Sequence, residues 1–188
     1  MKHIGTKNIE TSRLLLRRFQ SDDVDDMFEN WANDEAVTYF LTWPPHQNKE
    51  VTRQIIQDWI QQYEKLDNYN WAIVLKDNQK VIGSIAVTEQ NEKAQLAQIG
   101  YCLSRTYWHQ GIMSEALNAV IDFLFNQVEF ECIQARHAAN NLHSGGVMKK
   151  CGMTYEGTLR HSDWNNQGVC DICYYSILRS EYIKKEVL

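Results

Sequence analysis

Residues 111–125 are the part of the sequence that most restricts the possible folds. Strand-like runs flank them at 96–104 and 132–138. A strand, a helix and a further strand predict a βαβ unit, whose right-handed crossover places two parallel strands in one sheet. Ligands of such units bind at the C-terminal ends of the strands, facing the start of the crossover helix. The helix is indicated by apolar side chains in adjacent pairs every four residues: Ile112, Met113, Ala116, Leu117, Val120, Ile121, Leu124 and Phe125.

Around this unit the sequence predicts a mixed α/β fold. Turn-forming clusters at 76–80 and 90–95 separate three strand-like runs, which favours an antiparallel meander leading into the βαβ unit. Residues 140–153 are typical of a short helix with an asparagine at its start and Gly152 just beyond its end. The predicted strands are 11–19, 69–75, 81–89, 96–104, 132–138, 154–164 and 169–178, and the predicted helices are 21–31, 50–65, 111–125 and 140–153.

Length and charge restrict the class of protein. A chain of 188 residues is expected to form one domain over 1–188. The net charge of −5 argues against a nucleic-acid-binding protein, which usually has a basic face. We expect no membrane span, because no apolar run reaches about 18 residues. The N-terminal residues lack the apolar core of a secretory signal, so we expect a cytoplasmic protein.

Two of the five cysteines, Cys170 and Cys173, have the C-x-x-C spacing of many metal and redox sites. The residues around them favour a strand, and side chains three apart on a strand point to opposite faces of the sheet. No second C-x-x-C pair accompanies them. We therefore expect reduced, structural thiols and no metal site.

The segment YWHQGIMSEAL, residues 107–117, leads from the first strand of the βαβ unit into its helix. The first turn of a helix presents free backbone N–H groups and the positive end of the helix dipole, both of which suit a phosphate. The segment lacks the GxxxxGK and GxGxxG patterns of better-known phosphate loops. From these residues alone, an anion site and a plain strand-to-helix turn both remain open.

Taken with the rest of the chain, this segment resembles the GNAT superfamily of acyl-CoA-dependent N-acyltransferases. The resemblance is strongest to the branch of the Rim-type ribosomal-protein N-terminal acetyltransferases. It begins at IETSRLLLRRF and continues through VIGSIAV and IGYCLSRTYWHQGIMSEALNAVIDFLF to NNLHSGGVMKKCGMTYEGTLR. The resemblance therefore covers nearly the whole chain.

Two motifs carry the resemblance. Residues 108–113 align with the family's pyrophosphate loop, and Gly111 takes the position of its glycine. His109 and Met113 depart from the pattern, since the branch often has glycine at the first position and the family has Gly or Ala at the second. The second motif, N-x-x-S-x-x-V-x-x-K-x-G over 141–152, is more specific than the loop.

The resemblance implies a GNAT-type α/β fold with acetyl-CoA as co-substrate. The expected sheet is mixed and mostly antiparallel, with a central pair of parallel strands that splay apart and helices on both faces. Backbone groups of the first parallel strand would line the pantetheine arm and polarise the thioester. N–H groups of the loop would hold the pyrophosphate, and Asn141 would bond to the pantetheine region. The expected cofactor-binding residues are Tyr101, Cys102, Leu103, Gln110, Gly111, Ile112, Met113, Ser114 and Asn141.

The implied chemistry is direct attack of a neutral amine on the thioester in a ternary complex, without a covalent intermediate. It needs a base for the ammonium proton and a hydrogen-bond donor for the leaving thiolate. Asp163 matches the position of the branch's carboxylate base, although we would expect Glu there, and Ser144 matches the proposed donor. A surface-turn aspartate and a helix first-turn serine are the alternative interpretations.

The favoured acceptor is a protein N-terminal α-amine. The alternatives are a small amine, such as a polyamine, an amino acid or an aminoglycoside-like compound, and a non-catalytic CoA-binding protein. Trp43, on an aromatic loop, either forms a substrate-binding wall or fills the edge of the core. His109 is either a surface residue or a phosphate contact, and Gly145 and Gly146 either admit the cofactor or are tolerated. Homodimers are common in the branch, and the sequence leaves the oligomeric state open.

Overall fold

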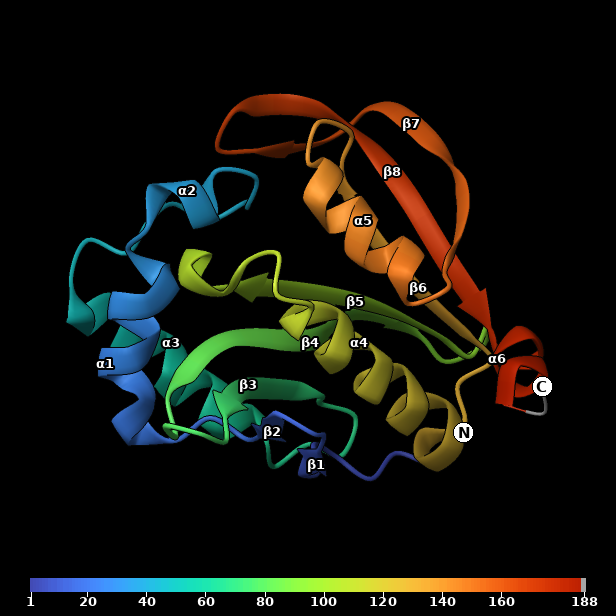
Figure 1. Ribbon diagram of the computed structural model, residues 1–188, viewed down its shortest axis with the longest axis horizontal. Coiled ribbons are helices and arrows are strands. Elements are labelled where there is room, and N and C mark those ends of the chain that lie inside the picture. Colours follow the sequence, from blue (N-terminus) through green and yellow to red (C-terminus); the bar gives the residue numbers. More distant parts are fainter. Residues whose placement is uncertain (187–188) are drawn as a thin grey trace.

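The computed structural model of the protein describes residues 1–186 and contains one eight-stranded sheet with helices on both faces (Figure 1). The strand order is β1-β2-β3-β4-β5-β6-β8-β7. Every neighbouring pair is antiparallel except β5 and β6, which are parallel. The strands are β1 Ile9–Glu10, β2 Leu14–Arg17, β3 Asn70–Leu75, β4 Val81–Asn91, β5 Leu96–Leu103, β6 Cys132–Ala138, β7 Thr154–Asn165 and β8 Gly168–Leu178. This arrangement confirms the fold class expected from the sequence.

The helices follow the predicted order with three differences. The predicted helix 21–31 is broken into a 3-10 turn, a single α-helical turn and a π-helical turn over 28–32. Two helices, α2 and α6, were not predicted, and α2 has only four residues, too few to show a 3.6-residue period. The helices are α1 Val24–Met27, α2 Glu35–Thr38, α3 Lys49–Gln62, α4 Ile112–Phe123, α5 Leu142–Lys150 and α6 Arg179–Glu186.

The sheet separates two hydrophobic clusters. Along β3, Trp71 and Ile73 belong to the cluster that includes residues of α4 and α5, whereas Ala72 and Val74 belong to the cluster that includes residues of α1 and α3. Successive side chains of a strand point to opposite faces, so each face of β3 needs its own apolar cover. α4 and α5 therefore cover one face of the sheet, and α1 and α3 cover the other.

The parallel strands separate at their C-terminal ends. Pairing of β5 with β6 ends at Ile99 and Ala135. Beyond that point β5 stays paired with β4 up to Leu103, and β6 stays paired with β8 up to Ala138. A gap therefore opens in the middle of the sheet, next to the first turns of α4 and α5.

Within residues 1–186, none of the helices combines the length and the apolar composition that crossing a bilayer requires.

Candidate active site

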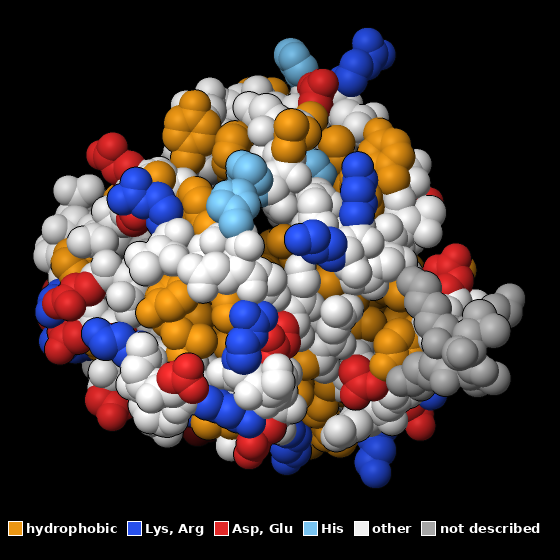
Figure 2. All heavy atoms as spheres, in the orientation of Figure 1, with side chains coloured by type: hydrophobic (Ala, Val, Ile, Leu, Met, Phe, Trp, Pro, Cys, Tyr) orange, Lys and Arg blue, Asp and Glu red, His pale blue; other side chains and the backbone are white. Residues whose placement is uncertain are grey.

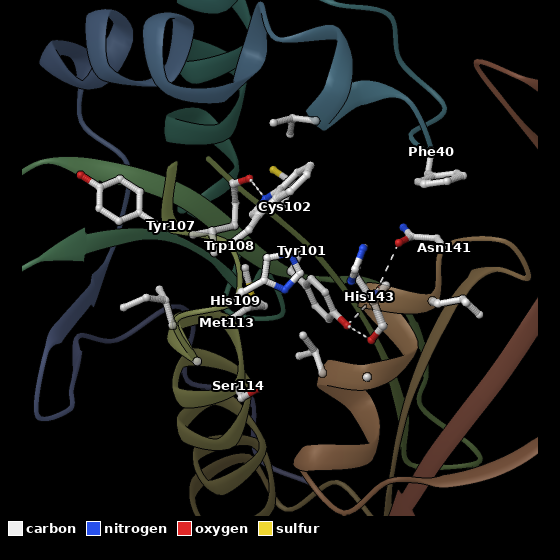
Figure 3. A pocket seen from close by; sticks show the side chains of 18 of the residues that line it. Phe40, Tyr101, Cys102, Tyr107, Trp108, His109, Met113, Ser114, Asn141 and His143 are labelled. Atoms are coloured by element: carbon white, nitrogen blue, oxygen red, sulfur yellow. Dashed lines mark hydrogen bonds between the residues drawn. The ribbon is translucent and has the colours of Figure 1, made fainter. Parts of the chain in front are cut away.

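The gap between β5 and β6 opens into a cavity of about 520 Å³ (Figure 3). Its walls come from four parts of the chain: the α2 region, the end of β5 with the following loop, the start of α4, and α5. The lining residues are Ala36, Val37, Tyr39, Phe40, Leu41, Tyr101, Cys102, Leu103, Tyr107, Trp108, His109, Gly111, Ile112, Met113, Ser114, Asn141, Leu142, His143, Ser144, Gly146, Val147 and Lys150. The structure thus brings together nearly all of the residues that the sequence assigned to the cofactor. Gln110, whose backbone carbonyl bonds to Arg13, belongs to the same loop but does not line the cavity.

The loop before α4 is turned so that the first turn of the helix faces this cavity. Gly111 caps the helix with φ +74°, in the left-handed region that glycine adopts at little cost. Glu115 is the first residue whose N–H bonds back into the helix, to the carbonyl of Gly111 at 3.0 Å. The Met113 side chain is only 5% exposed and packs in the main core. Met113, one of the two residues that depart from the family pattern, therefore leaves the helix N-terminus open.

An ion pair fixes the position of this loop against β2. Glu115 Oε2 lies 2.7 Å from Nε of Arg13, and Glu115 Oε1 accepts from the Thr11 and Ser12 hydroxyls and the Arg13 N–H. Burial alone would raise the pKa of Glu115, but these hydrogen bonds outweigh it and hold the pKa at about 2. Arg13 also donates to the carbonyl of Gln110 at 3.0 Å. The start of α4 is thus tied to residues 11–13, just before β2, by a pair that is charged at neutral pH.

One side of α5 forms the opposite wall of the cavity. Its lining residues His143, Gly146, Val147 and Lys150 have the i, i+3, i+4, i+7 spacing of a single helix face. A Cβ on Gly146 would meet no atom within 4 Å, so this glycine leaves open space on the cavity side. α5 begins at Asn141, whose side chain accepts from the Ser144 N–H at 3.4 Å, as expected for its N-cap.

The two glycines of α5 differ in their surroundings. Gly145 is buried against His137, and a Cβ there would lie 2.6 Å from the His137 Nε2. Gly145 is therefore required by packing between α5 and β6. Gly146 alone faces the cavity.

A tyrosine–serine pair links the end of β5 to the first turn of α5. The Tyr101 hydroxyl donates to the Ser144 carbonyl at 3.0 Å and accepts from the Ser144 Oγ at 3.1 Å. Burial raises the pKa of Tyr101 well above its usual range, so its phenol stays neutral. Beside it, burial raises the pKa of the Cys102 thiol, whose Sγ lies 3.2 Å from the Ser84 Oγ. The cavity therefore holds neutral hydrogen-bonding groups next to the backbone of β5.

Aromatic and aliphatic residues of the α2 region form the roof of the cavity. Tyr39, Phe40 and Leu41 all line it. The turn between β7 and β8 holds this segment in place: Asn166 N–H donates to the Leu41 carbonyl at 3.0 Å, and its Nδ2 donates to the carbonyls of Thr38 and Trp43, both at 2.8 Å. In Figure 1 the tip of the β7–β8 hairpin reaches over toward α2. The roof thus depends on two distant parts of the chain.

Besides Gln110, two further sequence-predicted site residues, Trp43 and Asp163, lie outside the cavity lining. Trp43 is partly buried and packs against the hydrophobic cluster under α1 and α3. The centroid of its ring lies 5.3 Å from that of His46. Asp163 lies on β7, where its Oδ2 is 2.9 Å from a guanidinium nitrogen of Arg136. Arg136 follows Ala135, the last residue of β6 paired with β5, so Asp163 stands at the point where the strands separate.

Sequence reasoning missed the side chains that make the roof and the α5 wall. His143 and Lys150 follow the helical spacing of 143, 146, 147 and 150, which could have been read from the sequence as one face once α5 was placed. Tyr39, Phe40 and Leu41 carried no periodic signal, because they lie in an irregular segment.

The charges around the cavity favour an anionic ligand at its mouth and an uncharged group inside. His109, His143 and Lys150 line it, and none of the described lining residues is Asp or Glu. Most of the remaining wall is apolar. Figure 2 shows histidine side chains near the middle of this face, with Lys or Arg side chains close by. Free N–H groups at the start of α4 add to this anion-binding character.

Comparisons with known proteins agree with this geometry. The model of the acetyltransferase (GNAT) domain family matches residues 13–154. The N-acetyltransferase YoaA of Bacillus subtilis is 29% identical over 174 residues, covering 91% of this chain and 96% of that protein. The ribosomal-protein-serine acetyltransferase of Escherichia coli is 26% identical over 137 residues, covering 72% and 75%. RimL, a ribosomal L7/L12 alpha-N-protein acetyltransferase solved with coenzyme A, superposes with a TM-score of 0.83 at 21% identity, covering 93% and 99%.

Proposed function

Because the chain belongs to the GNAT family and is an acetyl-CoA-dependent N-acetyltransferase, we propose that it transfers the acetyl group to the N-terminal α-amine of a protein. The single observation that carries this choice of acceptor is the absence of carboxylates from the described lining of the cavity. A polyamine or an aminoglycoside carries several positive charges, and burying them needs opposite charges nearby. An N-terminal amine carries one charge, which it loses before it attacks.

The relatives support the same acceptor class. The Escherichia coli protein is a ribosomal-protein-serine acetyltransferase, and RimL is a ribosomal L7/L12 alpha-N-protein acetyltransferase. A roof built by Tyr39, Phe40 and Leu41 suits the apolar atoms near a peptide N-terminus.

We place the cofactor with its phosphates at the start of α4 and its pantetheine arm in the gap between β5 and β6. The free N–H groups from Ile112 to Ser114 suit the pyrophosphate. The Leu103 carbonyl is occupied by the indole N–H of Trp108 at 2.8 Å, which fixes the end of β5. The backbone of Tyr101, unpaired on the β6 side, is then free to hold the arm and the thioester carbonyl, whereas Cys102 pairs with Ser84 of β4.

The reaction then needs a base for the ammonium proton and a hydrogen-bond donor for the leaving thiolate. The Asp163 carboxylate, held by Arg136, is the proposed base for the ammonium proton. The Ser144 hydroxyl, paired with Tyr101, is the proposed donor to the thiolate that leaves when the amine nitrogen bonds to the acetyl carbon. Both phenol and hydroxyl are neutral, so neither adds a charge that would oppose the leaving thiolate.

The test is release of free CoA from acetyl-CoA in the presence of single amines. The panel contains peptides with free N-termini, the same peptides with blocked N-termini, spermidine, free amino acids and an aminoglycoside. We expect turnover only with free N-terminal peptides. Turnover with spermidine or the aminoglycoside alone would contradict the acceptor assignment.

A thermal-shift titration separates an inactive protein from a wrong acceptor. A ligand that binds only the folded state raises the midpoint of unfolding with its concentration. A shift with acetyl-CoA and no turnover with any amine would indicate the non-catalytic CoA-binding alternative. No shift at saturating acetyl-CoA would contradict the cofactor placement itself.

A further inference from the structure

Two histidines stand opposite each other at the mouth of the cavity. The ring centroids of His109 and His143 lie 4.8 Å apart, with their planes at 76°. His109 comes from the loop before α4 and His143 from the first turn of α5, and both line the cavity. Figure 3 shows the two rings close together beside Tyr101. The pair therefore joins the two walls between which the cofactor is placed.

No burial or hydrogen bond within the described part of the protein accounts for the positions of the two rings. Both residues are exposed, so burial in the core does not hold them. Neither imidazole has a hydrogen-bond partner among the described residues. His109 also has φ +61°, a left-handed conformation that costs a non-glycine residue about 1–2 kcal/mol. A residue kept in this conformation at the rim of a binding cavity points to a role for its side chain.

The surroundings of the pair are cationic in a chain of net charge −5. Lys150 lines the same wall as His143. The Arg13 guanidinium would lie 3.7 Å from a Cβ on Gly111, next to the loop. Glu115 is the nearby acid, and its charge and that of Arg13 balance each other, so the positive charge left at this rim is that of Lys150. An anion is therefore the ligand that this rim fits.

We propose that His109 and His143 form a two-imidazole clamp that binds a phosphate group of CoA from both sides of the cavity mouth. The proposal rests on the cofactor placement given above. Each imidazole presents at least one N–H donor, and hydrogen bonds to a phosphate oxygen are charge-assisted. The clamp gives side-chain donors to a loop that has one glycine where the resembled family has more. The phosphate is either the pyrophosphate or the 3′-phosphate, which share this chemistry.

The test is calorimetric titration of the protein with CoA, 3′-dephospho-CoA and pantetheine. The variants are His109→Asn, His143→Ala and the double variant, because asparagine tolerates a left-handed backbone and position 143 is exposed on a helix. We expect each single variant to bind CoA about tenfold more weakly, the loss typical of one charge-assisted hydrogen bond. The double variant is expected to weaken CoA binding by less than the product of the two single fold-changes, because both rings act on one phosphate.

The three ligands identify the phosphate. A loss seen with CoA but not with 3′-dephospho-CoA assigns the clamp to the 3′-phosphate, and a loss seen with both assigns it to the pyrophosphate. Pantetheine carries no phosphate, so its binding is expected to be the same in all variants. An equal loss of pantetheine affinity would show that the histidines shape the cavity, and would overturn the clamp.

Matched controls are available on the same chain. His161 is exposed, has φ +49° and does not line the cavity, so His161→Asn controls for the backbone conformation at 109. Lys149→Ala changes an exposed residue of α5 outside the lining. CoA affinity within twofold of wild type in both histidine variants would overturn the clamp alone. Absence of CoA binding by the wild-type protein would overturn the cofactor placement as well.

Discussion

Gly145 lies directly against His137, so that a Cβ on the glycine would stand 2.6 Å from the imidazole Nε2. The backbone of α5 can approach β6 this closely only because position 145 has no side chain. His137 is held in return: its Nδ1 donates to the Ala138 carbonyl at 2.7 Å, and its ring stacks on Tyr175 at 5.6 Å.

Gly145→Ala is therefore expected to destabilise the protein by about 1–3 kcal/mol, the usual cost of overpacking a well-filled site. Gly146→Ala is the matched control, because a Cβ there meets no atom and alanine favours a helix by about 1 kcal/mol. Urea unfolding should show the two substitutions moving stability in opposite directions. Since Gly146 lines the cavity, its variant should also bind CoA more weakly. Equal stabilities for the two variants would contradict this account.

His137 should also make the protein less stable in weak acid. Burial lowers the pKa of His137 from 6.5; the hydrogen bond to Ala138 raises it in part, and the charge of nearby Lys149 lowers it further. Burial also lowers the pKa of His46. Below pH 6.5 the unfolded chain takes up protons that the folded chain does not. Stability is therefore full above that pH and falls below it, by at most about 1.4 kcal/mol per pH unit for each group.

Urea unfolding of the wild type and of His137→Gln between pH 8 and pH 5.5 measures this effect. The variant should lose part of the slope of stability against pH, and adding His46→Gln should remove more of it. A double variant with the wild-type slope would mean that neither histidine is responsible.

Glu115→Gln should loosen the start of α4. In the wild type the carboxylate accepts four hydrogen bonds from residues 11–13, and its pKa is held at about 2. A folded-state pKa below that of the unfolded chain gives stability that is present above pH 4.5 and is lost as the pH falls toward 2. We expect a loss of about 1–3 kcal/mol at pH 7, where solvent partly screens the charge. The loss should be smaller at pH 3.5, below pH 4.5, because the linkage contribution of the lowered pKa declines there. Glu64→Gln, at an exposed position, is the control, and a similar loss there would refute the assignment.

Asp163→Asn tests the proposed base. An amide cannot take the ammonium proton, so kcat with an accepted peptide should fall by roughly 100-fold or more, with unchanged affinity for acetyl-CoA. Asp171→Asn is the control: this neighbouring carboxylate accepts from the His161 N–H at 2.9 Å and has no proposed role in the reaction. Retention of full turnover across pH by Asp163→Asn would leave Asp163 as only the partner of Arg136.

Asn166→Ala should weaken the roof over the cavity without affecting the cofactor. It removes the side-chain donor to the carbonyls of Thr38 and Trp43. The acceptor KM should rise by about tenfold while the KM for acetyl-CoA stays constant, and backbone amides at 38–41 should exchange hydrogen faster. Gln167→Ala, at the exposed neighbouring position of the same turn, should change neither. A rise in both KM values would point to general disorder of the fold instead.

Short sequence patterns predicted the main strands and helices of the fold well. The bounds predicted for β6 are those observed, α5 has the predicted asparagine cap, which is Asn141, and the left-handed Gly152 lies just past its end as predicted. These features depend on residues within one turn or one strand. The βαβ unit followed from the long apolar face of α4, which has only one way to be buried against a sheet.

Contacts between distant segments could not be predicted in this way. The Tyr101 hydroxyl meets Ser144 only because β5 and β6 separate, and a sequence pattern does not show how far two strands separate. Which aromatic residues of the α2 region face the cavity is decided by Asn166, near the other end of the chain. Trp43 was the conspicuous residue in the sequence, but Tyr39, Phe40 and Leu41 form the roof of the cavity.

The roof held by Asn166 also sets the order in which the protein can become active during synthesis. The α2 region is translated before the β7–β8 turn that fixes it, and this turn is followed by β8, which must insert between β6 and β7. Until then a nascent chain can form the α4 side of the cavity, but its α2 side has no support from Asn166. The roof over the cavity is therefore fixed only after the β7–β8 turn has been translated.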